Sequence, residues 1–224
     1  KYGYPDSHFI CFPYETRRTG IYAVGSVRQP MDINDAKLDA TGAAMKAIQS
    51  MELTDQGKTV HPRVGDQTFP EFALDRCTSC KRCTEECPFG VLEEDEKGTP
   101  FPNAARCRSC GVCMGSCPVQ IISFKDSSPT IFKEMMTSFE MPDEFDEKPR
   151  ILIFACENDA LPVFDMAAMN RLKINTNVRI MPMRCLGGLN LIYVTDALSY
   201  GYDGIMFMGC AYGDDYQCHF VNGS

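Results

Sequence analysis

A cysteine pattern that occurs twice in the middle of the chain constrains the fold more than any other feature. The spacing Cys-x2-Cys-x2-Cys-x3-Cys-Pro starts at Cys77 and again at Cys107. Three cysteines at this spacing can wind around one [4Fe-4S] cluster. The proline after the fourth cysteine turns the chain away, so that the fourth cysteine reaches the other cluster. The repeat therefore predicts two [4Fe-4S] clusters within residues 71–126.

The predicted ligand sets are crossed between the two runs. Cluster one takes three cysteines of the first run and the last cysteine of the second: Cys77, Cys80, Cys83 and Cys117. Cluster two takes the remaining four: Cys107, Cys110, Cys113 and Cys87. Structural zinc is the weaker alternative, because zinc sites use two ligand pairs rather than a triplet with a distant fourth ligand. A disulfide framework is also weaker, because residues 1–30 contain no recognisable signal peptide.

Charge and hydropathy argue against two classes of protein. The formal net charge of −8 disfavours a nucleic-acid binder, which needs a basic face. The longest apolar run covers only residues 151–156, far short of the roughly 18 to 20 residues of a membrane span. The chain starts without Met, so we expect it to be cut from a longer protein.

The segment before the cysteines has the pattern of an α/β domain. Residues 21–24 predict a short strand that ends at Gly25, and a helix is expected after Pro30 with Asp32 or Asn34 as its cap. Small and apolar residues at helical spacing predict a face that packs on a sheet. They are Ala40, Ala43, Ala44, Ala47, Ile48 and Met51.

The segment after the cysteines alternates strand and helix. Strands are expected at 151–155, 178–183 and 204–208, with helices at 163–172 and 189–200. This alternation predicts parallel strands with right-handed crossovers. The expected organisation is therefore five segments: 1–52, a linker at 53–70, the cysteine module at 71–126, a linker with one short helix at 127–149, and 150–224.

Three further cysteines each follow the end of a predicted parallel strand. Because carboxyl ends of parallel strands meet at one edge of a sheet, Cys156, Cys185 and Cys210 are expected to converge there. Cys218 lies eight residues past Cys210 and can fold back. Four thiolates would suit a [2Fe-2S] cluster. The alternative, a set of buried thiols, stays open, because cysteine is often interior.

Two segments resemble known families. Residues 71–126 resemble the bacterial-type two-cluster ferredoxins. The first segment, from Thr19-Gly20-Ile21-Tyr22-Ala23-Val24-Gly25 to Thr41-Gly42-Ala43-Ala44, resembles the closing stretch of the FAD domain in the A subunit of heterodisulfide reductase. That resemblance implies FAD contacts from four residues near the helix start: Gly25, Ser26, Asp32 and Ile33. The Gly-rich dinucleotide fingerprint is absent here, and a generic strand–loop–helix is the alternative.

The last segment resembles the delta subunit of methyl-viologen-reducing hydrogenase. The matching stretches are Phe154-Ala155-Cys156, Arg184-Cys185 and Gly204-Ile205-Met206-Phe207-Met208-Gly209-Cys210, while Asp159 stands where that family has a second cysteine. Taken together, the chain resembles the B subunit of the quinone-interacting membrane-bound oxidoreductase of sulfate reducers. The most specific matches are Cys156-Glu157-Asn158-Asp159-Ala160 and Gly213-Asp214-Asp215-Tyr216-Gln217-Cys218-His219-Phe220.

The expected fold class follows from these parts: an α+β and α/β multi-module chain. It combines the tail of a flavoprotein α/β domain, a two-[4Fe-4S] ferredoxin-like module and a small parallel-sheet α/β domain. No Ser–His–Asp or Cys–His arrangement is recognisable, so no catalytic residue is assigned.

The family resemblance implies an iron–sulfur flavoprotein subunit of an oxidoreductase. Its cofactors would be two [4Fe-4S] clusters, FAD held with upstream sequence, and a [2Fe-2S] cluster. It would link the membrane quinone pool to adenylylsulfate reductase in dissimilatory sulfate reduction. It would be cytoplasmic and reach the membrane through a quinone-binding partner subunit, without nucleic acid and without a span of its own.

Two alternatives remain. The first is a soluble electron-transfer or bifurcating protein of the type of the heterodisulfide reductase A subunit, coupled to a hydrogenase or a formate dehydrogenase. In the second, the C-terminal domain is a non-redox docking module.

Overall fold

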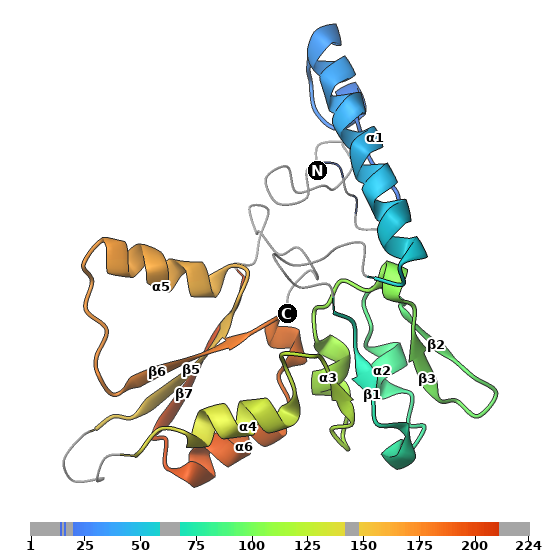
Figure 1. The fold of residues 1–224 in the computed structure, drawn as a ribbon. Helices are drawn as coiled ribbons and strands as arrows, with labels where there is room; N and C mark the ends of the chain where they lie inside the picture. Colours follow the sequence, from blue (N-terminus) through green and yellow to red (C-terminus); the bar gives the residue numbers. More distant parts are fainter. Residues whose placement is uncertain (1–13, 15, 17–19, 59–67, 142–147, 211–224) are drawn as a thin grey trace. The chain divides into compact units, whose positions relative to one another are not determined.

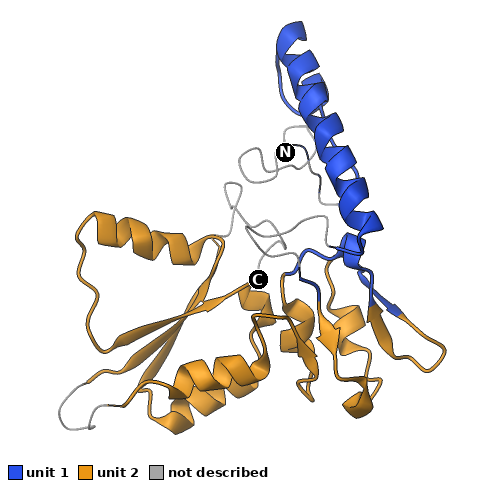
Figure 2. Ribbon diagram, in the orientation of Figure 1, with its two compact units in different colours: residues 1–69, 89–93, 102–109 blue, residues 70–88, 94–101, 110–224 orange. Residues whose placement is uncertain are grey.

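The structure is a computed structural model that describes residues 14, 16, 20–58, 68–141 and 148–210. The chain divides into two compact units (Figure 2). The first unit comprises residues 1–69, 89–93 and 102–109. The second comprises residues 70–88, 94–101 and 110–224, so it holds most of the cysteine module together with the C-terminal domain.

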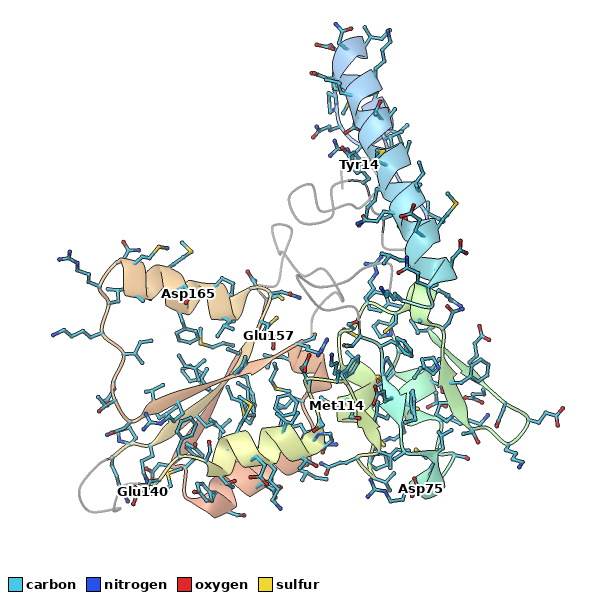
Figure 3. All side chains as sticks on the ribbon, viewed as in Figure 1. Tyr14, Asp75, Met114, Glu140, Glu157 and Asp165 are labelled. Atoms are coloured by element: carbon cyan, nitrogen blue, oxygen red, sulfur yellow. The ribbon has the colours of Figure 1, made fainter. Side chains whose placement is uncertain are left out.

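Helix α1 (Ile33–Asp55) is the main element of the first unit (Figure 1). It begins at Asp32, whose carboxylate accepts hydrogen bonds from the amides of Asn34 (2.7 Å) and Asp35 (3.0 Å). This cap supplies acceptors for two of the amides that a helix leaves without partners at its N-terminus. Of the two expected caps, Asp32 is confirmed. Tyr14 lies beside α1, close against Gly42 (Figure 3).

A buried carboxylate in α1 fixes the turn that precedes the helix. Asp39 accepts a hydrogen bond from the amide of Gly25 (2.7 Å) and pairs with the guanidinium of Arg28. Burial opposes ionisation of Asp39, but the bonds from Arg28 and Gly25 prevail and hold its pKa below the ordinary value. Gly25 has φ +63° and opens the 3₁₀ turn η1 (Gly25–Val27). Its left-handed conformation explains why a glycine is used there.

Two expectations for this segment are wrong. Residues 21–24 form an isolated bridge at Tyr22 rather than a strand. Of the residues expected on the packed face of α1, only Ala43 is buried, while Ile48 and Met51 are exposed by 47% and 60%. The buried side of α1 instead consists of Asp39, Ala43, Ser50 and Leu53. The reason is that polar anchors orient the helix: Asp39 bonds the η1 turn, and Ser50 accepts from the hydroxyl of Tyr22.

The two cysteine runs have the same local structure. Each is preceded by a 3₁₀ turn, continues through residues with positive φ, and ends in a short helix. The elements are η2 (Leu74–Arg76) with α2 (Arg82–Glu85), and η3 (Ala104–Arg106) with α3 (Val112–Ser116). Two two-stranded sheets accompany them: β1 (Glu71–Phe72) with β4 (Ile122–Ser123), and β2 (Leu92–Glu94) with β3 (Pro100–Pro102).

A parallel three-stranded sheet organises the C-terminal domain, as predicted. Its strands are β5 (Ile151–Cys156), β6 (Val178–Met183) and β7 (Gly204–Met208), in the order β6-β5-β7. Central strand β5 places Ile151 opposite both Val178 and Gly204. Leu152, Phe154 and Ala155 in β5 are exposed by no more than 1%. Such burial on both faces is usual for the central strand of a parallel sheet, and it accounts for the apolar run in the sequence.

Helices cover both faces of this sheet (Figure 1). Helix α5 (Ala160–Met169) lies on one face, where Leu161 and Phe164 border the core around Ile153 and Ala155. Helix α6 (Leu191–Tyr200) lies on the other face together with α4 (Pro129–Thr137). Opposite faces follow from right-handed crossovers, because the chain moves from β5 to one neighbour and then across to the other.

The segment expected as a second linker, 127–149, contains α4 and packs on α6. The hydroxyl of Tyr200 donates to the carbonyl oxygens of Thr137 (2.8 Å) and Phe139 (3.0 Å). The Tyr202 hydroxyl donates to the carbonyl of Met136 (3.3 Å). These bonds attach the segment to the C-terminal domain.

An ion pair joins the starts of β5 and β7. Arg150 donates to Asp203 from its amide (2.8 Å) and its guanidinium (2.9 and 3.0 Å). These bonds lower the pKa of Asp203 far below its ordinary value. None of the helices among the described residues is long and apolar enough to cross a membrane.

The second cysteine run packs directly on the C-terminal domain, through glycine backbones. Helix α3 contacts the 3₁₀ turn η4 (Leu186–Gly188), which follows β6. A Cβ at Gly115 would overlap the carbonyl group of Gly188, and one at Gly188 would lie 2.8 Å from the carbonyl oxygen of Gly111. Arg184 adds a cation–π contact, with its guanidinium carbon 4.6 Å from the ring centre of Phe124. The contact surface thus needs glycine at Gly115 and Gly188.

We predict that Gly115→Ala destabilises the protein by about 1–3 kcal/mol, because the new methyl group forces the α3 and η4 backbones apart. Gly204→Ala is the matched control, since its Cβ would meet only Ile151 Cγ1 at 4.0 Å, an ordinary contact. Urea unfolding followed by circular dichroism measures both variants. Equal stabilities for the two variants would contradict the tight backbone contact.

Candidate iron–sulfur site

Four cysteines from the two runs line one cavity in the second unit. They are Cys77, Cys80 and Cys83 of the first run and Cys117 of the second. The cavity has an empty volume of about 320 Å³, counted with its open mouth. Its other walls include Phe72 and Ile122 from the β1–β4 pair and Ile121, which precedes β4. The fourth cysteine of the first run, Cys87, does not line it.

The surroundings of these sulfurs are largely apolar. Cys83 and Cys117 are buried, with 9% and 6% exposure, whereas Cys80 is exposed. Burial raises the pKa of the Cys83 thiol, and the nearby Cys117 sulfur raises it further. Adjacent sulfurs in a low-dielectric site disfavour two bare thiolates. A cation or a cluster iron removes that penalty, because cysteine binds metal as the thiolate.

Backbone amides point at the first sulfur of each run. The Ser79 amide donates to Cys77 Sγ (3.4 Å), and the Ser109 amide donates to Cys107 Sγ (3.3 Å). Both serines have positive φ, 51° and 55°. Such N–H···S bonds stabilise negative charge on a thiolate. The Ser109 hydroxyl is used elsewhere, since it donates to the carbonyl of Thr68.

The expected second ligand set is distributed over both compact units. Cys107 belongs to the first unit, and Cys87, Cys110 and Cys113 belong to the second. Cys107, Cys110 and Cys113 are buried, while Cys87 is partly exposed. The common site of these four sulfurs remains a prediction.

The cavity at Cys117 offers four cysteines, the ligand set of a [4Fe-4S] cluster. Zinc draws four sulfurs to about 2.3 Å from one ion. Within residues 14, 16, 20–58, 68–141 and 148–210, no three His, Cys, Asp or Glu side chains come together closely enough for a single ion. Each of the four irons of a cubane binds one cysteine sulfur, so the four sulfurs lie farther apart than they would around a single ion. The four cysteines that line this hollow match that ligand set.

One residue of the C-terminal domain, Asn190, donates a hydrogen bond to the backbone of the cavity's fourth cysteine, a contact that the sequence did not predict. Asn190 caps α6 by accepting from the Ile192 amide (3.0 Å), and its Nδ2 donates to the carbonyls of Gly115 (2.9 Å) and Cys117 (3.4 Å). Tyr193, one turn on, is 2% exposed. Burial, together with the nearby Cys117 sulfur, raises the pKa of Tyr193 to about 12. An Asn before a helix does signal a cap, but nothing local signals its long-range partners.

The C-terminal cysteines lie at the predicted edge of the sheet. Cys156 is the last residue of β5. Cys185 lies two residues after the end of β6, and Cys210 lies two residues after the end of β7. The sulfurs of Cys156 and Cys210 are 3.9 Å apart. Cys156 also belongs to an apolar core cluster against which Cys210 packs. Cys218 lies outside the described residues, so the [2Fe-2S] cluster and the buried-thiol alternative both stay open.

The expected FAD contacts lie at the start of α1. Gly25 is buried, whereas Ser26, Asp32 and Ile33 are exposed. A shallow hollow nearby, about 660 Å³ with its open side, is lined by other residues, including Arg28, Asp35 and Asp39. The Asp32 carboxylate already accepts hydrogen bonds from the amides of Asn34 and Asp35. The contact of these four residues with FAD remains a prediction.

Two sequence families match parts of the chain. Residues 76–122 match the family described as 4Fe-4S dicluster domain. Residues 151–224 match the family of the delta subunit of methyl-viologen-reducing hydrogenase. The first match covers both cysteine runs, and the second begins at β5.

Longer relatives match nearly the whole chain. The A subunit of the ferredoxin/F420H2-dependent CoB-CoM heterodisulfide reductase of Methanosarcina acetivorans is 27% identical over 212 residues, which is 95% of the chain and 25% of that protein. The A subunit of the ferredoxin:CoB-CoM heterodisulfide reductase of Methanosarcina mazei is 28% identical over 214 residues, with the same coverage. The iron–sulfur D subunit of the F420-non-reducing hydrogenase of Archaeoglobus profundus is 30% identical over 77 residues, which is 34% of the chain and 54% of that protein.

The chain thus spans about a quarter of the length of the two long relatives. Its middle holds the duplicated cysteine runs, and its end is the parallel sheet of the C-terminal domain. The chain is related to the A subunit of heterodisulfide reductase, and it joins a 4Fe-4S dicluster domain to a domain similar to the delta subunit of methyl-viologen-reducing hydrogenase.

Proposed function

We propose that this chain is an electron-transfer subunit of an oxidoreductase complex and that two [4Fe-4S] clusters carry its electrons. The observation that carries the proposal is the cavity at Cys117, because one cysteine of the second run completes the triplet of the first. Crossed ligation brings two clusters close together within one module. Closely spaced clusters suit the passage of single electrons rather than a structural role alone.

In this proposal, Cys77, Cys80, Cys83 and Cys117 bind cluster one. Cys107, Cys110, Cys113 and Cys87 bind cluster two. The clusters supply one-electron chemistry when bound, and the chain holds them, excludes water and tunes them. The amides of Ser79 and Ser109 stabilise thiolate charge on Cys77 and Cys107.

Electron flow continues, in this proposal, into the C-terminal domain. Its carboxyl sheet edge carries Cys156, Cys185 and Cys210, and the turn after Cys185 packs on α3 of the second cysteine run. With Cys218, these thiols would hold a [2Fe-2S] cluster. FAD would be bound by Gly25, Ser26, Asp32 and Ile33 together with further sequence. Partner subunits would supply the donor and the acceptor.

For the complex as a whole, we propose a cytoplasmic oxidoreductase that links membrane quinone to adenylylsulfate reductase in sulfate reduction. Support comes from the resemblance carried by residues 156–160 and 213–220. A membrane quinone-binding partner would provide the membrane contact. A second candidate is a heterodisulfide reductase-type subunit, which the relatives from Methanosarcina favour because they match 95% of the chain.

Paired serine substitutions test the crossed ligation. We expect Cys117→Ser to lose the same cluster as Cys77→Ser, because both residues face one cavity. Cys87→Ser should lose the same cluster as Cys107→Ser. Electron paramagnetic resonance (EPR) of the reduced protein identifies which cluster signal disappears. If Cys117→Ser instead matches Cys107→Ser, each run holds its own cluster and the crossed assignment is wrong.

Substitutions at the sheet edge test the C-terminal site. We expect Cys185→Ser with Cys210→Ser to abolish a [2Fe-2S] signal while both cubane signals persist. If the native complex shows no [2Fe-2S] signal and the double variant fails to bind a partner subunit, this domain is a docking module. Unchanged iron content and unchanged assembly would make these cysteines ordinary core residues.

Activity of the complete complex separates the two candidate functions. The complete complex, purified from the organism that produces it, should oxidise a soluble quinol analogue and reduce adenylylsulfate reductase. The heterodisulfide of coenzymes M and B serves as the comparison substrate. Turnover of the heterodisulfide without quinol oxidation would favour the second candidate.

A further inference from the structure

The two cysteine runs differ in exposure although their local structures match. In the first run, Cys80 is exposed and Cys77 is partly exposed. The four cysteines of the second run are all buried: Cys107, Cys110, Cys113 and Cys117. Because the spacing and the turns of the two runs are the same, the difference comes from what packs on each loop.

The residue between the second and third cysteine of each run shows what covers the loop. In the second run this residue is Gly111, the left-handed N-cap of α3, and a Cβ there would lie 3.8 Å from side-chain carbons of Arg184. The C-terminal domain therefore packs on this loop. In the first run the same position holds Lys81, which is also left-handed. Lys81 lines the four-cysteine cavity and its side chain is 52% exposed, so this loop opens to solvent.

The tip of the β2–β3 hairpin stands beside the open loop. Glu94, the last residue of β2, pairs with Lys81, with 2.5 Å between Oε2 and Nζ. A Cβ at Gly98 would lie 3.5 Å from Lys81 Cε and 3.8 Å from Ser79 Cβ. The hairpin tip at 94–98 therefore borders the mouth of the cavity.

The surface around the open loop is acidic. Residues 70–88 and 94–101 carry seven acidic and four basic side chains, a net charge of −3. Asp95 and Glu96 at the hairpin tip are exposed. Residues 110–126, which hold α3, carry one charge of each sign and are neutral. A bound cubane adds negative charge at the mouth, because its four thiolates outweigh the positive charge of the cluster. Electrostatic attraction at this surface favours a partner with a basic face.

We propose that the open mouth at Cys80 is a docking site where cluster one exchanges single electrons with a redox protein that presents a basic face. The proposal rests on the proposed ligation of cluster one by Cys77, Cys80, Cys83 and Cys117. The rate of electron tunnelling falls steeply with distance. A partner therefore exchanges electrons fastest with the cubane whose ligand reaches the surface, and cluster two exchanges through cluster one.

The transfer at this site involves one electron and no proton. In the outward direction, reduced cluster one loses one electron and the oxidised centre of the partner gains it. The cysteine thiolates stay bound throughout. Cluster two, when reduced, then returns one electron to cluster one.

The first test is charge reversal at the hairpin tip, with Glu96→Lys as the variant and Glu134→Lys as the matched control. Glu134 is an exposed acid of α4, so both variants change the net charge equally. The probe is cytochrome c, a basic one-electron acceptor, mixed by stopped flow with the reduced, cluster-loaded protein at low ionic strength. We expect oxidation to slow about threefold to tenfold in Glu96→Lys and to change little in Glu134→Lys. Equal rates in the two variants would overturn the proposal.

The second test measures how close each cubane lies to solvent. A neutral dysprosium chelate in solution speeds the electron-spin relaxation of a nearby paramagnetic cluster, and the effect weakens with distance. The EPR signal that Cys77→Ser abolishes belongs to cluster one. We expect the chelate to relax this signal more strongly than the signal of cluster two.

The outcomes separate this proposal from the ligation on which it rests. Two cubane signals that relax equally, or a cluster-two signal that relaxes more strongly, would overturn the docking site alone. A purified protein with fewer than two cubanes would overturn the proposed ligation and the docking site with it.

Discussion

Cys117 is fixed from two sides, and the arrangement of the second unit depends on it. Cys117 lines the same cavity as Cys77, Cys80 and Cys83. Its carbonyl accepts a hydrogen bond from Asn190, the cap of α6 in the C-terminal domain. A single residue thus joins the two cysteine runs and attaches them to the parallel sheet.

Glycine makes this attachment possible. The backbones of α3 and η4 approach so closely that a methyl group at Gly115 has no room. Close backbone contact and short polar bonds position a redox centre more firmly than a flexible linker would. The segment expected as a linker, 127–149, contains α4, whose last residues accept hydrogen bonds from the hydroxyls of Tyr200 and Tyr202. For electron transfer, a fixed distance between sites is the useful property.

The sequence was most informative where the signal is local. The strand at 178–183 and the strand at 204–208 were predicted to the residue, because short apolar runs bounded by turns leave few choices. The two cysteine runs also carry their pattern within a dozen residues each. The buried face of α1 was misjudged, because hydrogen bonds of Asp39 and Ser50 orient that helix rather than an apolar stripe. Asn190 escaped notice because the groups that it contacts, at Gly115 and Cys117, lie more than 70 positions away in the sequence.

The central claim is that the chain holds two cubanes in its duplicated cysteine runs. Iron and acid-labile sulfide analysis, combined with Mössbauer spectroscopy of the purified protein, tests it most directly. The account predicts about eight irons and eight sulfides per chain in [4Fe-4S] clusters, with any [2Fe-2S] cluster additional to these. Zinc in place of iron, or the iron of a single cubane, would contradict it.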